Sequence, residues 1–467
     1  MRSPIPCPPL LRAAATDEFD PLPASQADQV ALAKLQAAIP QRAAHAAVAP
    51  DVFVQDRRAT ATTLREIDAA HGGGWFRVGD AATWDVEAAD ADLGGSTAVV
   101  DVQTHLVDAR QFHGPPARAL SGFLQMVDPQ RWADGVDARH IDAAAWAALV
   151  FGASETAIAL LTSTPGLDAD NVLTGAQIAV TRDLVARYSD IERVLTHTIV
   201  HPNHGTAQLD AMVEWRADLR PSAWKVYTLS GPPTAAAPTG GWFLDDEEVG
   251  GAFLQRVEAL GPRIVCAHKG LGGPIPDASV AAASPRDIGP AAKAFPSIDF
   301  VVYHSGYERD PGNEEGAYEP TSPSGVDRLV ASLETSGIRP GTNVWAELGS
   351  TWYLMLRRPQ EAAHVLGKLL CAVGPDRILW GTDSAWYGSP QPLIDAFRAF
   401  CIPEWMCELY GYPRLDTATK ELILGVNAAE LYGLSAQHLA LARADHGDWP
   451  VHGGPALRAA VRAAGRT

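Results

Sequence analysis

The sequence has few cysteines, few basic residues and no long apolar run. None of its five cysteines in 467 residues forms a Cys-x-x-Cys pair, which favours reduced thiols over a disulfide framework. Lysine and arginine number 37 against 55 aspartates and glutamates, so the net charge is −18 and neither nucleic acid nor an anionic membrane is expected as a partner. No apolar stretch reaches the length of a membrane helix or a signal-peptide core. These absences predict an acidic, soluble, cytoplasmic protein.

The texture of the chain changes after Gly94 and Gly95. Residues 1–95 are expected to form an N-terminal extension, of which 1–25 are rich in proline and alanine and loosely ordered. Beyond the glycines, short and nearly continuous apolar runs alternate with amphipathic stretches, a pattern typical of parallel strands and their covering helices. Eight runs are predicted as strands: Thr97–Val102, Thr156–Leu161, Arg193–Val200, Ala223–Leu229, Arg263–Ala267, Ile298–Tyr303, Asn343–Leu348 and Arg377–Trp380.

Eight alternations of strand and helix indicate an α/β protein with a (β/α)₈ TIM barrel over residues 96–435. An open doubly wound sheet is the alternative, but no Gly-x-Gly-x-x-Gly turn follows the first strand. Residues 436–467, rich in alanine and arginine, are expected to form a short C-terminal tail.

Candidate functional groups gather at the carboxyl ends of the predicted strands, where barrels of this kind carry their active sites. The first strand ends in Asp101, Gln103 and His105, which alternate along it and so project to one side. Imidazoles, a carboxylate and a side-chain oxygen that meet at one point form a site suited to a divalent ion, with zinc the first choice and manganese or cobalt the alternatives. The later strand ends add these groups: Lys225 and Tyr227, His268, His304, Glu347, Asp383.

Several stretches resemble the amidohydrolase superfamily, in particular its amidohydrolase-related branch. That branch contains hydrolases and the aminocarboxymuconate-semialdehyde and resorcylate types of decarboxylase. The resemblance rests on the sequences VCAHKGLG, FVVYHSGYE and ILWGTDSAWYGSPQ and on a closing helix at 425–433. It extends from the first strand to that helix.

The resemblance implies roles for four residues. His105 and His268 would be metal ligands, Asp383 both a ligand and the acid–base carboxylate, and His304 a catalytic group that acts on substrate. The sequence departs from the family at Gln103, where histidine or glutamate is usual. A neutral amide oxygen is a poorer ligand, so Gln103 is predicted either to bind the metal weakly or to have left its coordination shell.

Four further residues are expected to bind substrate: Lys225, Tyr227, Glu347 and Trp386. By the same resemblance, Lys225 lies on the strand where members with two metals carry a carbamylated lysine. A second metal ion is expected only if Lys225 is carbamylated, and an unmodified lysine is favoured.

The leading hypothesis is a hydrolase with one metal ion that cleaves the C–N or C–O bond of an amide, amidine, lactone or ester through a metal-bound water. The alternatives are a non-oxidative, metal-dependent decarboxylase and a binding barrel that has lost its full metal shell. The expected partner is a small or medium polar substrate, and a homo-oligomer is left open.

Overall fold

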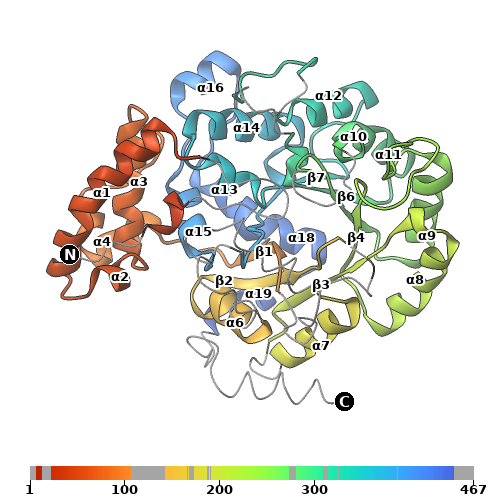
Figure 1. Cartoon of the computed structure of the whole chain (residues 1–467), viewed down its shortest axis with the longest axis horizontal. Helices are drawn as coiled ribbons and strands as arrows, with labels where there is room; N and C mark the ends of the chain where they lie inside the picture. Colours follow the sequence, from red (N-terminus) through yellow and green to blue (C-terminus); the bar gives the residue numbers. More distant parts are fainter. Residues whose placement is uncertain are drawn as a thin grey trace.

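The computed structural model describes residues 7–12, 23–106, 142–165, 167, 173–186, 189, 191–272, 280–308, 314–322, 325–386 and 388–445. Within these, eight parallel strands pair in sequence order, from the first to the eighth. The predicted barrel with an N-terminal extension is therefore confirmed (Figure 1). Each strand overlaps its predicted run: β1 (Val99–Thr104), β2 (Thr156–Leu161), β3 (Val194–Ile199), β4 (Ala223–Tyr227), β5 (Ile264–His268), β6 (Asp299–Tyr303), β7 (Val344–Glu347) and β8 (Ile378–Leu379).

The ring closes between the segment that begins with β8 and β1. Only two residues form β8, but hydrogen bonds to β1 continue beyond it. Val102 N donates to Trp380 O at 3.0 Å, and Asp383 N donates to Gln103 O at 2.8 Å. The backbone that closes the barrel thus carries two candidate site residues.

Helices surround the barrel and fill the connections. The helix α7 begins with a capping box, in which Thr174 and Gln177 satisfy one another's backbone amides. The barrel helices are α6 (Ala143–Ala147), α7 (Gly175–Val185), α8 (Thr206–Asp218), α9 (Ala252–Leu260), α10 (Val280–Ala283), α11 (Ile288–Ala294), α12 (Asp327–Ser336), α13 (Thr351–Met355), α14 (Pro359–Ala372), α15 (Gln391–Ala399), α16 (Glu404–Tyr410), α17 (Thr417–Glu421) and α18 (Asn427–Tyr432). None of the described helices is long and apolar enough to span a membrane.

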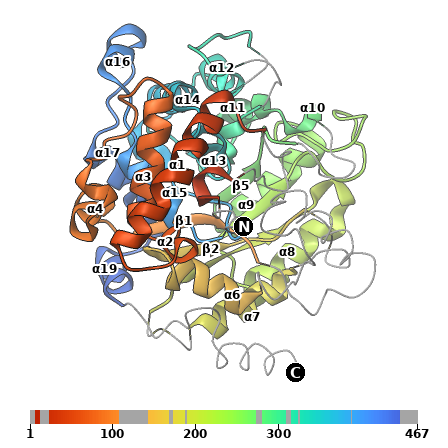
Figure 2. The ribbon, with the colours of Figure 1, turned by 60° about the vertical axis from the view of Figure 1, so that its left-hand side comes forward.

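Four helices of the extension pack beside the barrel: α1 (Gln26–His45), α2 (Pro50–Phe53), α3 (Arg57–Ala70) and α4 (Val86–Leu93). Turning the molecule brings α1 and α3 to the front, side by side (Figure 2). Leu35 and Ile39 of α1 and Leu64 and Ile67 of α3 are buried between them and their neighbours. Of the expected loose arm, residues 7–12 and 23–25 are described, and Leu10 and Leu11 are buried there.

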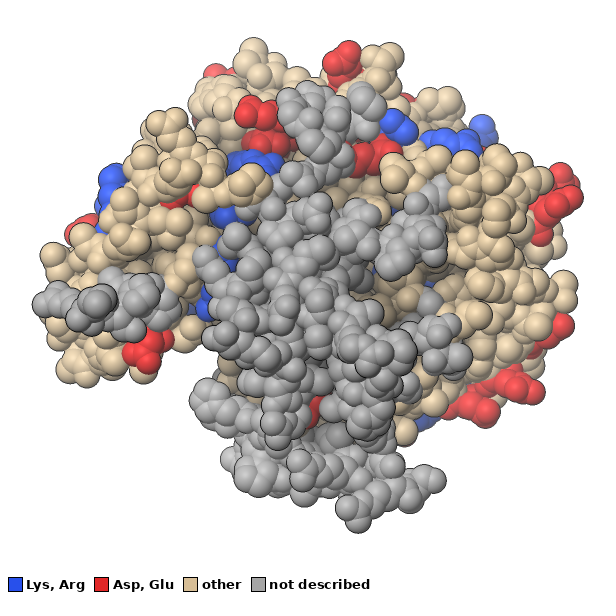
Figure 3. Space-filling view, viewed as in Figure 1, with Lys and Arg blue, Asp and Glu red and all other residues tan. Residues whose placement is uncertain are grey.

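The tail begins with α19 (Ala436–Ala444), and residues 446–467 lie outside the described part of the chain. Acidic side chains stand out along the margin formed by α8 and α9 (Figure 3), in keeping with the net charge.

Successive residues of each strand point alternately toward the surrounding helices and toward the barrel interior, and so contribute to two apolar layers. One set faces the helices, as Trp224 and Val226 of β4 do. The other set, which includes Val102, Cys266 and Tyr303, fills the barrel interior. The side chains at the carboxyl ends of the interior set are polar, and they form the candidate site.

Candidate active site

Closure of the ring brings Asp383 beside the end of β1. His105 Nε2 lies 2.9 Å from Asp383 Oδ1, and both residues are buried. Gln103 Nε2 donates to the same oxygen at 3.1 Å, while Ser350 Oγ donates to Asp383 Oδ2. The structure therefore joins three of the predicted site residues and adds Ser350, which no sequence motif indicated.

An irregularity in β1 separates Asp101 from this group. The pairing with β2 shifts register between Asp101 and Thr104. Asp101 accepts hydrogen bonds from the backbone N–H and the hydroxyl of Thr382 on the β8 side. Burial raises the pKa of Asp101 to about 7. Asp101 thus fastens β1 to the segment that carries Asp383.

His268 and His304 face one another across the ends of β5 and β6. His304 Nε2 lies 3.2 Å from His268 Nδ1. The other ring nitrogens contact carbonyl oxygens, His304 Nδ1 that of Gly349 at 2.7 Å and His268 Nε2 that of Leu271. Because a carbonyl only accepts, those nitrogens must donate, and the two facing nitrogens then carry lone pairs. A proton or a metal cation between them would stabilise this arrangement.

Glu347 lies beneath His304. Its Oε2 accepts the backbone N–H of His304 at 2.9 Å, and burial raises its pKa to about 7. A Cβ at Gly381 would overlap Glu347 Oε1, and one at Gly349 would overlap Gln103 Oε1, so a larger residue at either position would displace one of these side chains. Glu347 is therefore held against the backbone, as a support for His304.

Lys225 is buried on the interior face of β4. Its Nζ lies 3.3 Å from the centroid of the Tyr303 ring and 4.9 Å from that of Tyr227. His197 of β3, which the sequence analysis missed, is also buried, with Nε2 3.4 Å from the hydroxyl of Tyr303. Burial, with Lys225 nearby, holds the pKa of His197 well below its usual range. His197 lies within the predicted strand Arg193–Val200. The alternation of side chains along that strand could have placed it on the interior face of the barrel.

Two aromatic rings that were predicted to bind substrate stack on the candidate ligands. Trp386 lies against His105, with centroids 5.5 Å apart and planes at 26°. Tyr227 lies against His268 at 5.0 Å and 27°, and its hydroxyl donates to Ser163 O at 3.2 Å. These contacts fix the orientation of the imidazoles.

Backbone strain is concentrated at this end of the barrel. Six described residues other than glycine have a positive φ, and four of them, namely His304, Ser305, Ser350 and Asp383, follow β6, β7 and β8. Such conformations persist only where the surrounding structure imposes them, and they cluster at functional sites. The strain therefore supports the choice of this end as the active site.

Within each of two facing pairs, the donor atoms are spaced as neighbouring ligands of a divalent ion would be. Neighbouring ligands on one ion are about 3 Å apart, close to the His105–Asp383 and His268–His304 separations. His105 Nε2 makes no hydrogen bond within the described residues. No three His, Cys, Asp or Glu side chains in the described ranges already stand together as a metal cluster. Gln103 presents its amide nitrogen to Asp383, and so supports that carboxylate in this arrangement.

The profile of the Amidohydrolase family matches residues 100–434, most of the chain. The chain belongs to the amidohydrolase family. Members of this family are metal-dependent enzymes, so the resemblance noted in the sequence and the prediction of a metal-dependent enzyme are confirmed. None of the curated proteins matches this sequence.

Solved structures similar to this chain include two decarboxylases and an amidohydrolase. One is 5-carboxyvanillate decarboxylase from Novosphingobium aromaticivorans with bound manganese, at 12% identity and a TM-score of 0.44, covering 73% of this chain and 98% of its own. Another is 2,6-dihydroxybenzoate decarboxylase from Rhizobium, at 14% identity and a TM-score of 0.41. The match covers 73% of this chain and 99% of the decarboxylase. The third is an amidohydrolase from Mycobacterium avium subsp. paratuberculosis, at 16% identity and a TM-score of 0.38. The match covers 73% of this chain and 100% of that amidohydrolase.

Proposed function

We propose that this member of the amidohydrolase family is a metal-dependent decarboxylase of a small, flat carboxylate, the alternative rather than the leading hypothesis of the sequence analysis. The observation that supports this choice is Lys225, fully buried against Tyr303 and Tyr227. A carboxylate brings a negative charge into a low-dielectric interior and needs a fixed cation there. The amide, ester or lactone of a hydrolase substrate is neutral and does not. The aromatic walls suit a flat substrate.

The proposed ligands are His105, Asp383 and His268, while Gln103 orients Asp383. A divalent ion held there would neutralise substrate charge and polarise its oxygen atoms. Zinc stays the predicted ion, with manganese as its competitor. Lys225 is proposed to bind the substrate unmodified, so a second ion is not part of the proposal.

His304 is proposed to supply the proton, carried on Nε2. This atom lies 3.2 Å from His268 Nδ1, whose lone pair is left for the ion. When the bond to the carboxyl carbon breaks, CO₂ leaves and the electron pair stays on the substrate carbon. The proton of His304 then forms the new C–H bond, and solvent restores it. Burial favours the overall step because a carboxylate and an imidazolium are converted into neutral CO₂, arene and imidazole.

Hydrolysis is the second candidate, supported by the proximity of Asp383 Oδ1 to His105 Nε2. A carboxylate in that position could act as a general base toward water. The cellular location and the oligomeric state stay predictions.

Product analysis in D₂O distinguishes decarboxylation from hydrolysis. Chain loaded with Mn²⁺ or Zn²⁺ is offered hydroxybenzoates in one panel and aryl esters and lactones in another. We expect CO₂ and an equimolar arene with one deuterium at the vacated carbon. Lys225→Met should lose about 10²-fold in turnover or more, and Lys225→Arg less, because arginine keeps the charge. Ester or lactone cleavage without CO₂ would reject the decarboxylase.

A further inference from the structure

A tight turn connects β7 to α13. Thr351 N donates to Gly349 O at 2.6 Å across Ser350, whose φ is 57° and ψ −41°. A hydrogen bond between residues two apart, with these angles at the central residue, defines a γ-turn of the rare, strained kind. Ser350 is also buried. Neither its conformation nor its burial suits serine unless the side chain has a specific task.

Each residue of the turn contacts one of the two principal functional groups. Ser350 Oγ donates to Asp383 Oδ2, and Gly349 O accepts from His304 Nδ1 at 2.7 Å. Thr351 Oγ1 donates to His304 O at 2.8 Å. The turn after β7 therefore holds groups that come from β6 on one side and from the β8 segment on the other.

We propose that this γ-turn aligns His304 with Asp383 and that Ser350 is a positioning residue for the Asp383 carboxylate. With Oδ2 engaged by the hydroxyl, the carboxylate is rotated so that Oδ1 faces His105 Nε2. Partners of a ligating carboxylate fix its orientation and tune its affinity for metal. The inference rests on the proposed role of Asp383 as a ligand.

Ser305 provides a matched control. It is equally buried and also has a positive φ, 52°. Its hydroxyl, however, donates to the backbone oxygen of Glu347 at 2.7 Å and does not contact Asp383. Glycine adopts a positive φ without strain, so Ser350→Gly and Ser305→Gly each remove a hydroxyl while preserving the backbone.

The experiment is calorimetric titration of the chelator-treated full chain with Mn²⁺ alone, together with thermal unfolding. Ser350→Gly should bind Mn²⁺ about 10- to 100-fold more weakly with no loss of melting temperature. Ser305→Gly should stay within about twofold of the parent, since it leaves Asp383 untouched. Ser350→Asn, which tolerates a positive φ and restores a donor, should recover part of the loss.

Two results would overturn the inference: unchanged Mn²⁺ affinity in Ser350→Gly, or an equal loss in Ser305→Gly. Asp383→Ala separates this failure from failure of the proposed function. If Asp383→Ala loses Mn²⁺ while Ser350→Gly does not, only the positioning role is wrong. If Asp383→Ala binds Mn²⁺ like the parent, the proposed metal site is wrong and the inference falls with it.

Discussion

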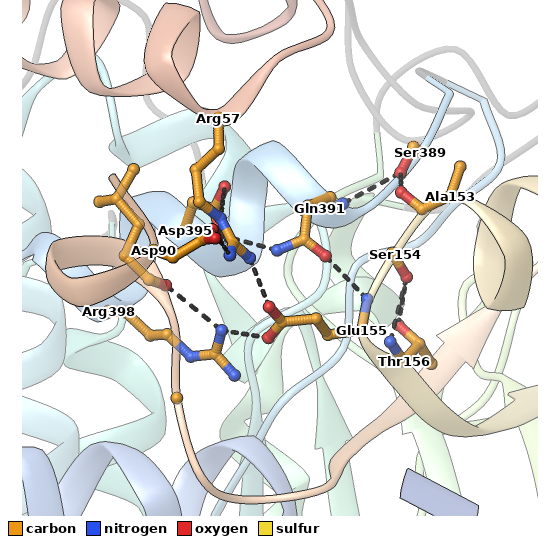
Figure 4. Close-up of polar contacts among 12 residues, drawn as sticks. Arg57, Asp90, Ala153, Ser154, Glu155, Thr156, Ser389, Gln391, Asp395 and Arg398 are labelled. Carbon is orange, nitrogen blue, oxygen red and sulfur yellow. Dashed lines mark hydrogen bonds and ion pairs between the residues drawn. The ribbon is translucent and has the colours of Figure 1, made fainter. Parts of the chain in front are cut away.

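Two polar clusters in this molecule are built on opposite principles. At the junction between the extension and the barrel, charges of opposite sign alternate (Figure 4). Arg57 of α3 binds Asp395 of α15 at 3.1 Å, Asp90 at 2.7 Å and Glu155, which also binds Arg398. At the candidate active site, two imidazole nitrogens face each other and the backbone is strained. Paired charges stabilise a junction, whereas backbone strain of this kind clusters at functional sites.

The largest effect should come from His304→Ala. Loss of a positioned proton donor should lower turnover about 10²- to 10⁴-fold, while metal content measured by elemental analysis stays near that of the parent. His268→Ala should lose metal and turnover together. If His304→Ala removes the ion as completely as His268→Ala does, His304 is a ligand and the assigned roles are wrong.

Arg57→Ala should be the most damaging change at the junction. It leaves the carboxylate of Asp395, only 1% exposed, without its cation, at a cost of about 3 kcal/mol in the free energy of unfolding by urea. Arg58→Ala is the control, because Arg58 pairs with Asp56 at the start of its own helix and should cost about 1 kcal/mol or less. Arg57→Ala should bind Mn²⁺ normally. A weakened affinity would show that the two clusters are coupled.

Adding metal also tests whether the junction cluster and the candidate active site are independent of one another. Mn²⁺ at about 100 times its dissociation constant should raise the free energy of unfolding by about 2.7 kcal/mol. The increment should be the same in Arg57→Ala and absent in Asp383→Ala. An equal increment in Asp383→Ala would place the ion elsewhere.

The smallest effect concerns Glu155. Burial alone would raise its pKa, but Arg398 and Arg57 outweigh burial and hold the pKa below its usual value. Its stabilisation is therefore present above the unfolded-state pKa and is lost as the pH falls through the folded-state value. Glu155→Gln should cost about 1 kcal/mol at pH 7, since the side chain is partly exposed, and the cost should shrink as the pH falls through the folded-state pKa of Glu155. A penalty independent of pH would mean that shape, not charge, matters at this position.

The sequence predicted the eight strands well because apolar runs record burial on both faces. Where the sequence prediction was wrong or incomplete, polar contacts between distant segments determine the local structure. The first strand was expected at Thr97–Val102 and lies two residues later, at Val99–Thr104, since its end pairs with the β8 segment. The histidine pair could not be foreseen, because the direction of an imidazole depends on carbonyls of distant loops. Ser350 was missed for a similar reason: nothing in the local sequence marks a serine with a positive φ.

The short β8 gives the seam of the ring an unusual property. Three of its hydrogen bonds use the backbone of site residues, since Gln103 O accepts from Asp383 N, His105 O accepts from Ala385 N at 3.2 Å and Ser384 O accepts from His105 N. A fluctuation that opens the seam must therefore dismantle the site in the same event. Hydrogen exchange at the Asp383 amide would then report the fraction of molecules that are momentarily inactive, and a bound ion should slow that exchange more than any other in the barrel.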